Sequence, residues 1–368
     1  MKKTNLKSYF TQRDRENFLK LIKIINEELP TFCEDFFIAL EGRATTLTRL
    51  AYAYDLKLFF RYLVTESRAF LGKPVKDITL SQLENLPSIE IEKYLSFLTY
   101  YTNIQDEVCK NSAKSKARKL SALRSMFKYF VKKEMIARDP TMAVDMPKIR
   151  EKEIIRLDGG EIEKMLDAAE TGSGLSARQL SYHKNTAIRD TAIVALFLGT
   201  GIRVSELVGI DISDINFDNM SFVVTRKGGN RVQLYFSDEV AGILYEYYLC
   251  RKQDRNIPPS ENAFFVSLQN KRISTRAVEN IIKKYASLAT PKKITPHKLR
   301  STFGTQLYRQ TGDIYVVADV LGHKDINTTK KHYAAMSDDI RRKASTEVSL
   351  REKGEFDKND DNNGRRDN

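Results

Sequence analysis

The stretch TPHKLRSTFGTQLYRQTGDIYVVADVLGHKDINTTKKHY, residues 295–333, decides how this chain is interpreted. Pro296 is placed to begin a helix, because its fixed φ and missing N–H suit the first helical turn. His297 and Arg300 then stand at positions i and i+3, on one face of that helix. A short apolar run follows and ends at Gly322, a typical helix terminator. The stretch therefore predicts two consecutive helices, the first of which carries a histidine and an arginine side by side.

Further polar candidates surround this stretch. Arg203 follows Thr200-Gly201 at the expected start of a helix, where backbone amides favour an anion. Upstream of residue 295, two apolar runs flank Lys227-Gly-Gly-Asn230, which predicts a β-hairpin with the lysine at its tip. His323 follows the second expected helix directly, and Tyr333 comes ten positions later.

These residue types match what cleavage of a phosphodiester without a metal requires. Arginines bind the non-bridging oxygens in a fork and stabilise the charge of the transition state. A lysine or histidine protonates the leaving 5′ oxygen, and a tyrosine acts as covalent nucleophile. The chain supplies these parts in one half, in the order Arg203, Lys227, His297, Arg300, His323 and Tyr333.

Each residue taken alone has a more ordinary explanation. A His-x-x-Arg pair usually consists of exposed side chains without a function, and a lysine next to two glycines usually belongs to an ordinary hairpin turn. Most of the 17 tyrosines are expected to pack in the core. His332 is expected to be a structural or surface residue, because neighbours on a helix point apart. His183 has no visible partner and is expected at the surface, in a polar loop over residues 175–185. The hypothesis rests on the six candidates occurring together.

Composition favours a polyanionic partner. The 368 residues carry 61 Lys and Arg against 48 Asp and Glu, a net charge of +13, which favours nucleic acid or an anionic membrane surface. The longest apolar stretch, Thr191 to Gly199, is far shorter than the roughly 20 residues that span a bilayer, so no membrane partner is expected. No apolar segment follows the charged start, so no signal peptide is expected. Three widely spaced cysteines fit no metal-ligand pattern and are expected as buried or half-buried thiols in a reducing cytoplasm.

The hydrophobic pattern predicts two domains. Residues 1–147 show helical stripes only and predict an all-α domain. Residues 148–157 are polar and charged and are expected to be a linker. Residues 158–345 mix helices with the hairpin, and residues 346–368 are nearly free of apolar side chains and are expected to be disordered. The overall class is mainly α with a small β-sheet.

One helix of the first domain carries a basic face. Its apolar positions run from Leu120 to Val131. The opposite face is expected to contact DNA, although such a run alone is as often a solvated face. Its residues are Lys114, Lys116, Arg118, Lys119, Arg124 and Lys128. Arg226, beside the hairpin turn, is expected to contact DNA as well.

Several segments together resemble the tyrosine recombinase (phage integrase) family, and in particular its Xer-type members. In the second half these are Thr200-Gly-Ile-Arg-Val-Ser-Glu-Leu207, His297-Lys-Leu-Arg-Ser-Thr-Phe303 and Leu321-Gly-His323, followed by Tyr333. In the first half, Tyr54-Asp-Leu-Lys-Leu-Phe59 and residues 118–127 are similar to the helical core-binding (SAM-like) domain. The resemblance covers roughly residues 30 to 345.

The resemblance implies a C-shaped clamp around duplex DNA and a function in site-specific recombination. Arg203 and Arg300 would hold the scissile phosphate, Lys227 would protonate the leaving 5′ oxygen, and His297 and His323 would assist proton transfer. Tyr333 would form a 3′-phosphotyrosyl intermediate. No metal or other cofactor is implied, and the partners would be two duplexes bound by a homo- or heterotetramer, with a second recombinase or an accessory protein as further partners.

The biological role stays open at this stage. Ser301 stands where many members have a basic residue, and the step from His323 to Tyr333 is one residue longer than in Xer proteins that resolve chromosome dimers. This spacing resembles integrases of mobile elements, whereas the lack of an arm-binding domain before residue 40 favours a Xer-type role. A catalytically silent DNA-binding protein and a type IB topoisomerase are the alternatives from other classes.

Overall fold

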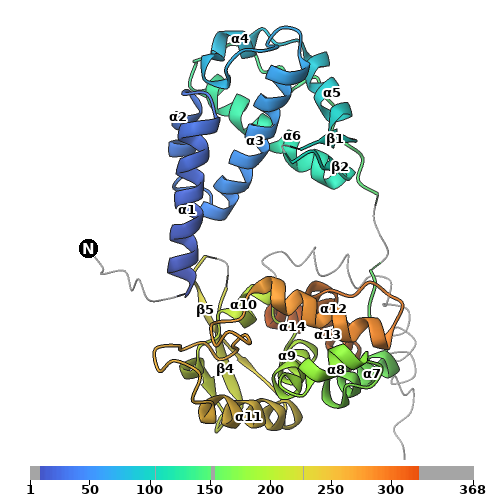
Figure 1. The fold of residues 1–368 in the computed structure, drawn as a ribbon. Coiled ribbons are helices and arrows are strands. Elements are labelled where there is room, and N and C mark those ends of the chain that lie inside the picture. Colours follow the sequence, from blue (N-terminus) through green and yellow to red (C-terminus); the bar gives the residue numbers. More distant parts are fainter. Residues whose placement is uncertain (1–8, 104, 151–153, 227, 323–368) are drawn as a thin grey trace, which may run out of the picture. The chain divides into compact units, whose positions relative to one another are not determined.

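The chain forms two compact units, Met1–Lys152 and Glu153–Asn368, drawn in Figure 1. The computed structural model describes residues 9–103, 105–150, 154–226 and 228–322. The division between the units falls inside residues 148–157, the segment expected as a linker. The expected disordered tail lies outside the described residues.

The first unit is helical apart from one pair of very short strands. In chain order its elements are α1 (Tyr9–Glu28), α2 (Cys33–Ala39), α3 (Thr46–Glu66), a 3₁₀ turn (Val75–Asp77), α4 (Leu80–Glu84), α5 (Ser88–Phe97), β1 (Tyr101–Thr102), β2 (Val108–Cys109) and α6 (Ala113–Lys132). The strands pair antiparallel, with Tyr101 opposite Cys109. The expected helical domain is confirmed, but the strand pair was not expected, since two residues are too few to give an alternating pattern.

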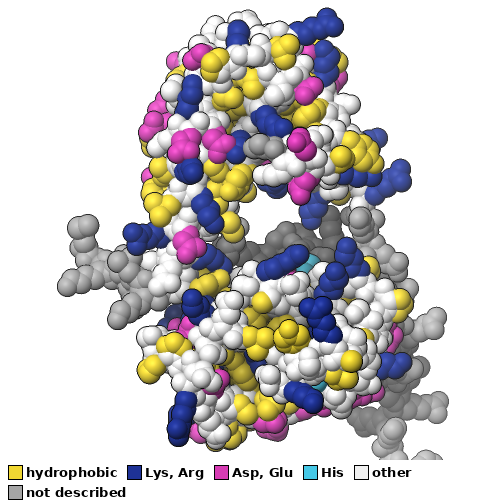
Figure 2. Space-filling model, viewed as in Figure 1, with side chains coloured by type: hydrophobic (Ala, Val, Ile, Leu, Met, Phe, Trp, Pro, Cys, Tyr) yellow, Lys and Arg dark blue, Asp and Glu magenta, His cyan; other side chains and the backbone are white. Residues whose placement is uncertain are grey.

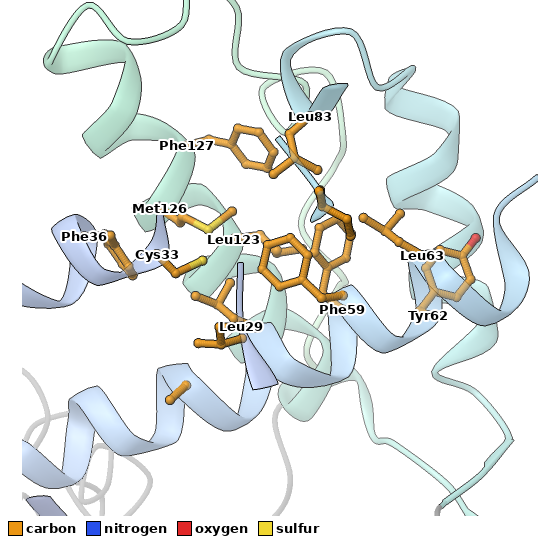
Figure 3. Close-up of a cluster of buried hydrophobic side chains, with 14 of the residues drawn as sticks. Leu29, Cys33, Phe36, Phe59, Tyr62, Leu63, Leu83, Leu123, Met126 and Phe127 are labelled. Atoms are coloured by element: carbon orange, nitrogen blue, oxygen red, sulfur yellow. The ribbon is translucent and has the colours of Figure 1, made fainter. Parts of the chain in front are cut away.

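Aromatic side chains fill the core of the first unit. Phe59 on α3 and Phe127 on α6 are fully buried and lie among Leu63, Leu123 and other apolar side chains, as Figure 3 shows. The ring of Phe59 meets that of Tyr94 edge-on, with centroids 5.2 Å apart, a favoured geometry for aromatic pairs. This core fixes α6 against α3 and thereby sets which face of α6 is left for solvent.

The second unit combines helices with a three-stranded sheet. Its elements are α7 (Gly159–Thr171), α8 (Ala177–His183), α9 (Ala187–Thr200), α10 (Val204–Val208), a 3₁₀ turn (Ile212–Asp214), β3 (Ile215–Asn216), β4 (Ser221–Thr225), β5 (Arg231–Tyr235), α11 (Asp238–Gln253), α12 (Thr275–Ala289), α13 (Pro296–Thr311) and α14 (Ile314–Leu321). All three strands are antiparallel in the order β3-β4-β5. The expected hairpin is confirmed, with Thr225 opposite Arg231 at its turn.

Helix α9 is the central element of the second unit. It packs against α7, α11, α12 and α13, and residues such as Ile193 and Phe197 are completely buried. From Ala192 to Leu198 it is apolar on all sides, which is typical of a helix enclosed by others. Gly201 ends α9 with a φ of +61°, where a Cβ would overlap the ring of Phe303 on α13. The chain is thereby held close to α13 just before Arg203.

A buried polar network corrects the expectation for residues 175–185 and His183. The segment forms α8 instead of a loop, and His183 is buried. Its Nδ1 lies 3.1 Å from the hydroxyl of Tyr285, which donates to Asp190 Oδ2 at 2.9 Å. Lys284 Nζ also donates to this carboxylate, at 2.9 Å. The side-chain partner of His183 is 102 residues away in sequence, so no local pattern reveals it.

The structure tests two further expectations, one about the burial of the cysteines and one about membrane-spanning helices. Cys33 is buried and Cys109 partly exposed, but Cys250 is exposed, which contradicts the expectation that all three thiols are at least half-buried. Within the described ranges, no helix is both long enough and apolar enough to cross a bilayer.

Candidate active site

Arg203 lies at the N-terminus of α10, as its position after Gly201 predicts. Its guanidinium Nη1 donates to Glu206 Oε1 at 2.7 Å, and its backbone N–H donates to Glu206 Oε2 at 2.9 Å. Glu206 is buried, whereas the Arg203 side chain is 38% exposed. One edge of the guanidinium is therefore oriented by a buried carboxylate while part of it faces solvent.

Arg300 lies on α13 and is buried. Its Nη1 donates to the carbonyl of Gly201 at 2.7 Å, and its Nη2 donates to the carbonyl of Leu321. Arg300 thus joins the residue that ends α9 to the last turn of α14. Burial of a cation is tolerated where its donors meet acceptors, and the last carbonyls of a helix supply such acceptors along with the negative end of the helix dipole.

Arg226, at the end of β4, reaches the same place from the sheet. Its Nη2 donates to the carbonyl of Val320 at 2.9 Å. Its guanidinium covers Gly322, the residue that ends α14, so closely that a Cβ there would overlap it. Arg203 contacts this residue too, because its Nη2 donates to the Gly322 carbonyl at 3.3 Å.

Three arginines from three different elements therefore meet at the C-terminus of α14. Their formal charge of about +3 is offset by Glu206 and by the partial negative charge of the helix end, about half a unit. Guanidinium groups are the strongest side-chain binders of phosphate, since they stay charged and donate in a planar fork. Such a cluster, with Arg203 partly open to solvent, is suited to hold a phosphodiester.

His297 lies in the first turn of α13 and is exposed, whereas Arg300, one turn on, points into the protein. The helix and its Pro296 start are confirmed. The structure therefore brings Arg203, Arg226 and Arg300 together, and it places His297 at the surface, three residues before Arg300. Lys227, His323 and Tyr333 lie outside the described residues, as does His332.

The basic residues of α6 do not form one solvent-facing row. Lys119 is buried and its Nζ donates to Asp55 Oδ1 at 2.9 Å, which corrects the expectation that it lies on the exposed face. Arg118 also pairs with Asp55. Lys116 donates to Thr99 Oγ1 at 2.6 Å.

Arg124 is partly buried and donates to the carbonyl of Val144, beyond the end of the helix. Lys114 and Lys128 are exposed, and among the described residues neither has a polar partner. These two are the members of the set best placed to meet a phosphate. Figure 2 shows Lys and Arg side chains spread over the viewed face of both units.

Sequence reasoning missed Glu206 and Gly322 as site residues. Glu206 stands three positions after Arg203. An acidic side chain at this spacing often accepts a hydrogen bond from the backbone N–H of the residue that caps a helix, so the spacing could have predicted the contact. Gly322 was recognised as a helix end, but the arginine that covers it comes from the sheet, 96 positions earlier in the chain. No local pattern predicts that contact.

The model of the phage integrase family matches residues 156–339, half of the chain and nearly all of the second unit. The chain belongs to this family. Among its curated relatives, tyrosine recombinase XerC of Caldanaerobacter subterraneus is 30% identical over 332 residues, covering 87% of this chain and 86% of the relative. Tyrosine recombinase XerS of Lactococcus lactis is 30% identical over 341 residues, covering 86% and 94%.

Solved structures of the integrase family share the fold. The XerH recombinase bound to a palindromic difH substrate, in a post-cleavage complex, has a TM-score of 0.59 and 19% identity, and covers 90% of this chain and 94% of that one. Lambda integrase (residues 75–356) bound as a dimer to a core site has a TM-score of 0.57 and 18% identity, covering 81% and 96%. The expected combination of an N-terminal helical domain with an α+β catalytic domain is therefore confirmed.

Proposed function

We propose that this chain is a site-specific tyrosine recombinase that cuts and rejoins duplex DNA through a 3′-phosphotyrosyl intermediate. The observation that carries the proposal is that Arg203 and Arg300 meet at the end of α14. Arg203 donates to the carbonyl of Gly322, and Arg300 donates to the carbonyls of Leu321 and Gly201. Membership of the family and the similarity to recombinases over most of the chain support it.

The roles of the side chains follow from their chemistry. Arg203 and Arg300 bind the non-bridging oxygens of the scissile phosphate, where guanidinium groups stabilise the charge that gathers in the transition state. Tyr333 Oη attacks phosphorus and the bond to the 5′ oxygen breaks. Lys227 gives a proton to that oxygen, and His297 and His323 assist proton transfer and bind phosphate oxygen.

Rejoining reverses these steps. A 5′ hydroxyl of the partner strand attacks the phosphotyrosine, so the energy of the broken bond is kept and no cofactor or metal is called on. Four protomers on two duplexes would exchange strands in this way, and the solved relatives include a lambda integrase tetramer bound to a Holliday junction. The helical domain expected over residues 1–147 would bind the DNA core site, with Lys114 and Lys128 of α6 as DNA-contacting candidates.

The biological role that the comparisons favour is of the Xer type, in which a cytoplasmic recombinase resolves chromosome dimers. The curated relatives at 30% identity carry the names XerC and XerS. Integration or excision of a mobile element is the second candidate, favoured by the ten-residue step from His323 to Tyr333.

A trapping assay separates these roles. Nicked duplexes that carry either chromosomal candidate sites or mobile-element ends from the native genome are incubated with the protein, and covalent adducts are collected. Adducts on a chromosomal site alone support the Xer-type role, whereas adducts on element ends alone overturn it. Relaxation of plasmids that lack any such site would instead support a topoisomerase.

A further inference from the structure

Arg226 joins the β4–β5 turn to the end of α14. Its backbone N–H donates to the Asn230 carbonyl at 2.8 Å, and its own carbonyl accepts from Gly229 N at 3.0 Å, so its main chain forms part of the turn. Its side chain crosses to α14 and donates to Val320 O at 2.9 Å. One residue therefore fixes two segments that are far apart in sequence.

The surroundings of Arg226 explain why α14 ends in glycine. Gly322 has a φ of +62°, which side chains other than glycine's rarely adopt. A Cβ at this position would also overlap the Arg226 guanidinium. The close approach of the sheet to the helix end therefore depends on a long planar side chain on one segment and on the lack of any side chain on the other.

Arg226 differs from the other two arginines in what its guanidinium can reach. Its Nε is buried without a hydrogen-bond partner, and within the described part of the chain it forms no ion pair. Nη2 is engaged by Val320, and the face of the group is covered by Gly322. A partly buried cation that has no carboxylate partner lowers the stability of the fold. Because Arg226 lies at the edge of the proposed phosphate site, its presence despite this cost indicates that it helps to assemble the site. Because Nη2 is used by α14 and Nε is buried, positioning is favoured over direct binding of phosphate.

We infer that Arg226 is a positioning residue for strand cleavage, which holds the β4–β5 turn against the end of α14. This inference rests on the proposed function, in which Lys227 protonates the leaving oxygen. Arg226 and Gly322 each directly precede, in the chain, a residue proposed to take part in proton transfer, Lys227 and His323. Both of these lie outside the described residues, and the inference is drawn from the contact that precedes them.

The leaving group provides a test that separates positioning from phosphate binding. In cleavage of normal DNA, the P–O5′ bond breaks as the tyrosine oxygen bonds to phosphorus, and O5′ takes a proton from the lysine. If sulfur replaces O5′, the P–S bond breaks and a thiolate leaves without that proton, because thiols ionise with a pKa near about 8.5. A defect in proton delivery therefore slows cleavage of the oxygen substrate and spares the sulfur substrate, whereas a defect in phosphate binding slows both.

The experiment measures single-turnover cleavage of matched oxygen and 5′-phosphorothiolate duplexes by the full-length chain. Arg226→Met, which keeps the apolar stem, is expected to slow the oxygen substrate by about tenfold or more, a part of the roughly 10²–10⁴-fold that general acid catalysis contributes, and the sulfur substrate far less. Gly322→Ala is expected to give the same selective loss, because the new methyl displaces the guanidinium. Both substrates are cleaved by one protein sample, so a loss of folded protein cancels in the ratio of the two rates.

Two controls make the result decisive. Arg231→Met removes an arginine from the same hairpin whose side chain is 64% exposed and paired with Asp214, and it is expected to leave the ratio unchanged. Lys227→Ala is expected to show the largest selective loss; if it shows none, the proposed role of Lys227 fails. If Lys227→Ala is selective and Arg226→Met slows both substrates equally, the inference about Arg226 alone is overturned.

Discussion

Replacing Glu206 by glutamine isolates one ion pair in the proposed site. The buried Glu206 accepts two hydrogen bonds from Arg203, one from the backbone N–H at 2.9 Å and one from Nη1 at 2.7 Å. Glutamine has the same shape and its amide oxygen still accepts from the backbone N–H, as Gln does at this helix position. The variant therefore keeps the start of α10, but it loses the negative charge and replaces the oxygen that accepts from Nη1 with an amide NH2, which cannot accept.

The size of the effect follows from the strength of such a contact. A hydrogen bond between charged groups contributes about 1.5–3 kcal/mol. If Arg203 binds the phosphate most strongly in the transition state, this amount is lost from the barrier, and about 1.4 kcal/mol corresponds to tenfold in rate. Glu206→Gln is therefore expected to slow single-turnover cleavage by about 10- to 150-fold, while affinity for the duplex changes much less.

The assay is cleavage of a nicked suicide duplex, followed as covalent adduct against time with protein in excess. Glu239→Gln is the matched control, because Glu239 is exposed in the first turn of α11, and it is expected to cleave at the wild-type rate. Cleavage by Glu206→Gln at the wild-type rate would refute the reasoning, since Arg203 would then need no orientation by this carboxylate.

Three further predictions concern stability and DNA binding. Burial alone would raise the pKa of Glu161, but hydrogen bonds from Lys292, Thr290 and the Asp158 backbone outweigh it and lower the pKa from 4.5 to about 2. The ionised carboxylate therefore stabilises the fold above about pH 4.5, and this contribution is lost towards pH 2. The free energy of unfolding of Glu161→Gln in urea should depend less on pH between these values than that of wild type, and an equal pH dependence would contradict the role of Glu161. Asp190→Ala leaves the buried network without its carboxylate and is expected to cost about 3–5 kcal/mol in urea unfolding; a cost below about 1 kcal/mol would show that the network is dispensable. Duplex affinity is expected to fall with salt with a log–log slope of about −0.9 per phosphate contact, and Lys114→Ala and Lys128→Ala should each reduce the slope by about 1, whereas an unchanged slope would remove them from the interface.

Local sequence patterns predicted several elements of the second unit. Pro296 at the start of α13 and Gly322 at the end of α14 are signals that act within one helical turn, and both are confirmed. The Lys-Gly-Gly-Asn turn likewise predicted the β4–β5 hairpin, since its conformation depends on its own glycines.

Long-range contacts were not predictable in the same way. A helical wheel separates the apolar from the basic positions of α6, but it places Lys119 on the solvent face because it contains no information about Asp55 on α3, 64 residues earlier. His183 was assigned to the surface for the same reason, since its partner lies on α12. The six catalytic candidates followed from chemistry and order along the chain, whereas the way in which Arg203, Arg226 and Arg300 share the end of α14 required the fold.

The central claim is that Tyr333 forms the covalent bond to DNA, and adduct trapping tests it most directly. Wild type and Tyr333→Phe are incubated with nicked duplexes that carry candidate sites, and the products are separated under denaturing conditions. We expect a covalent protein–DNA adduct, attached through a 3′ phosphate, with wild type only, while both proteins bind the duplex equally. An adduct that persists in Tyr333→Phe, or no wild-type adduct on any site that the protein binds, would contradict the account.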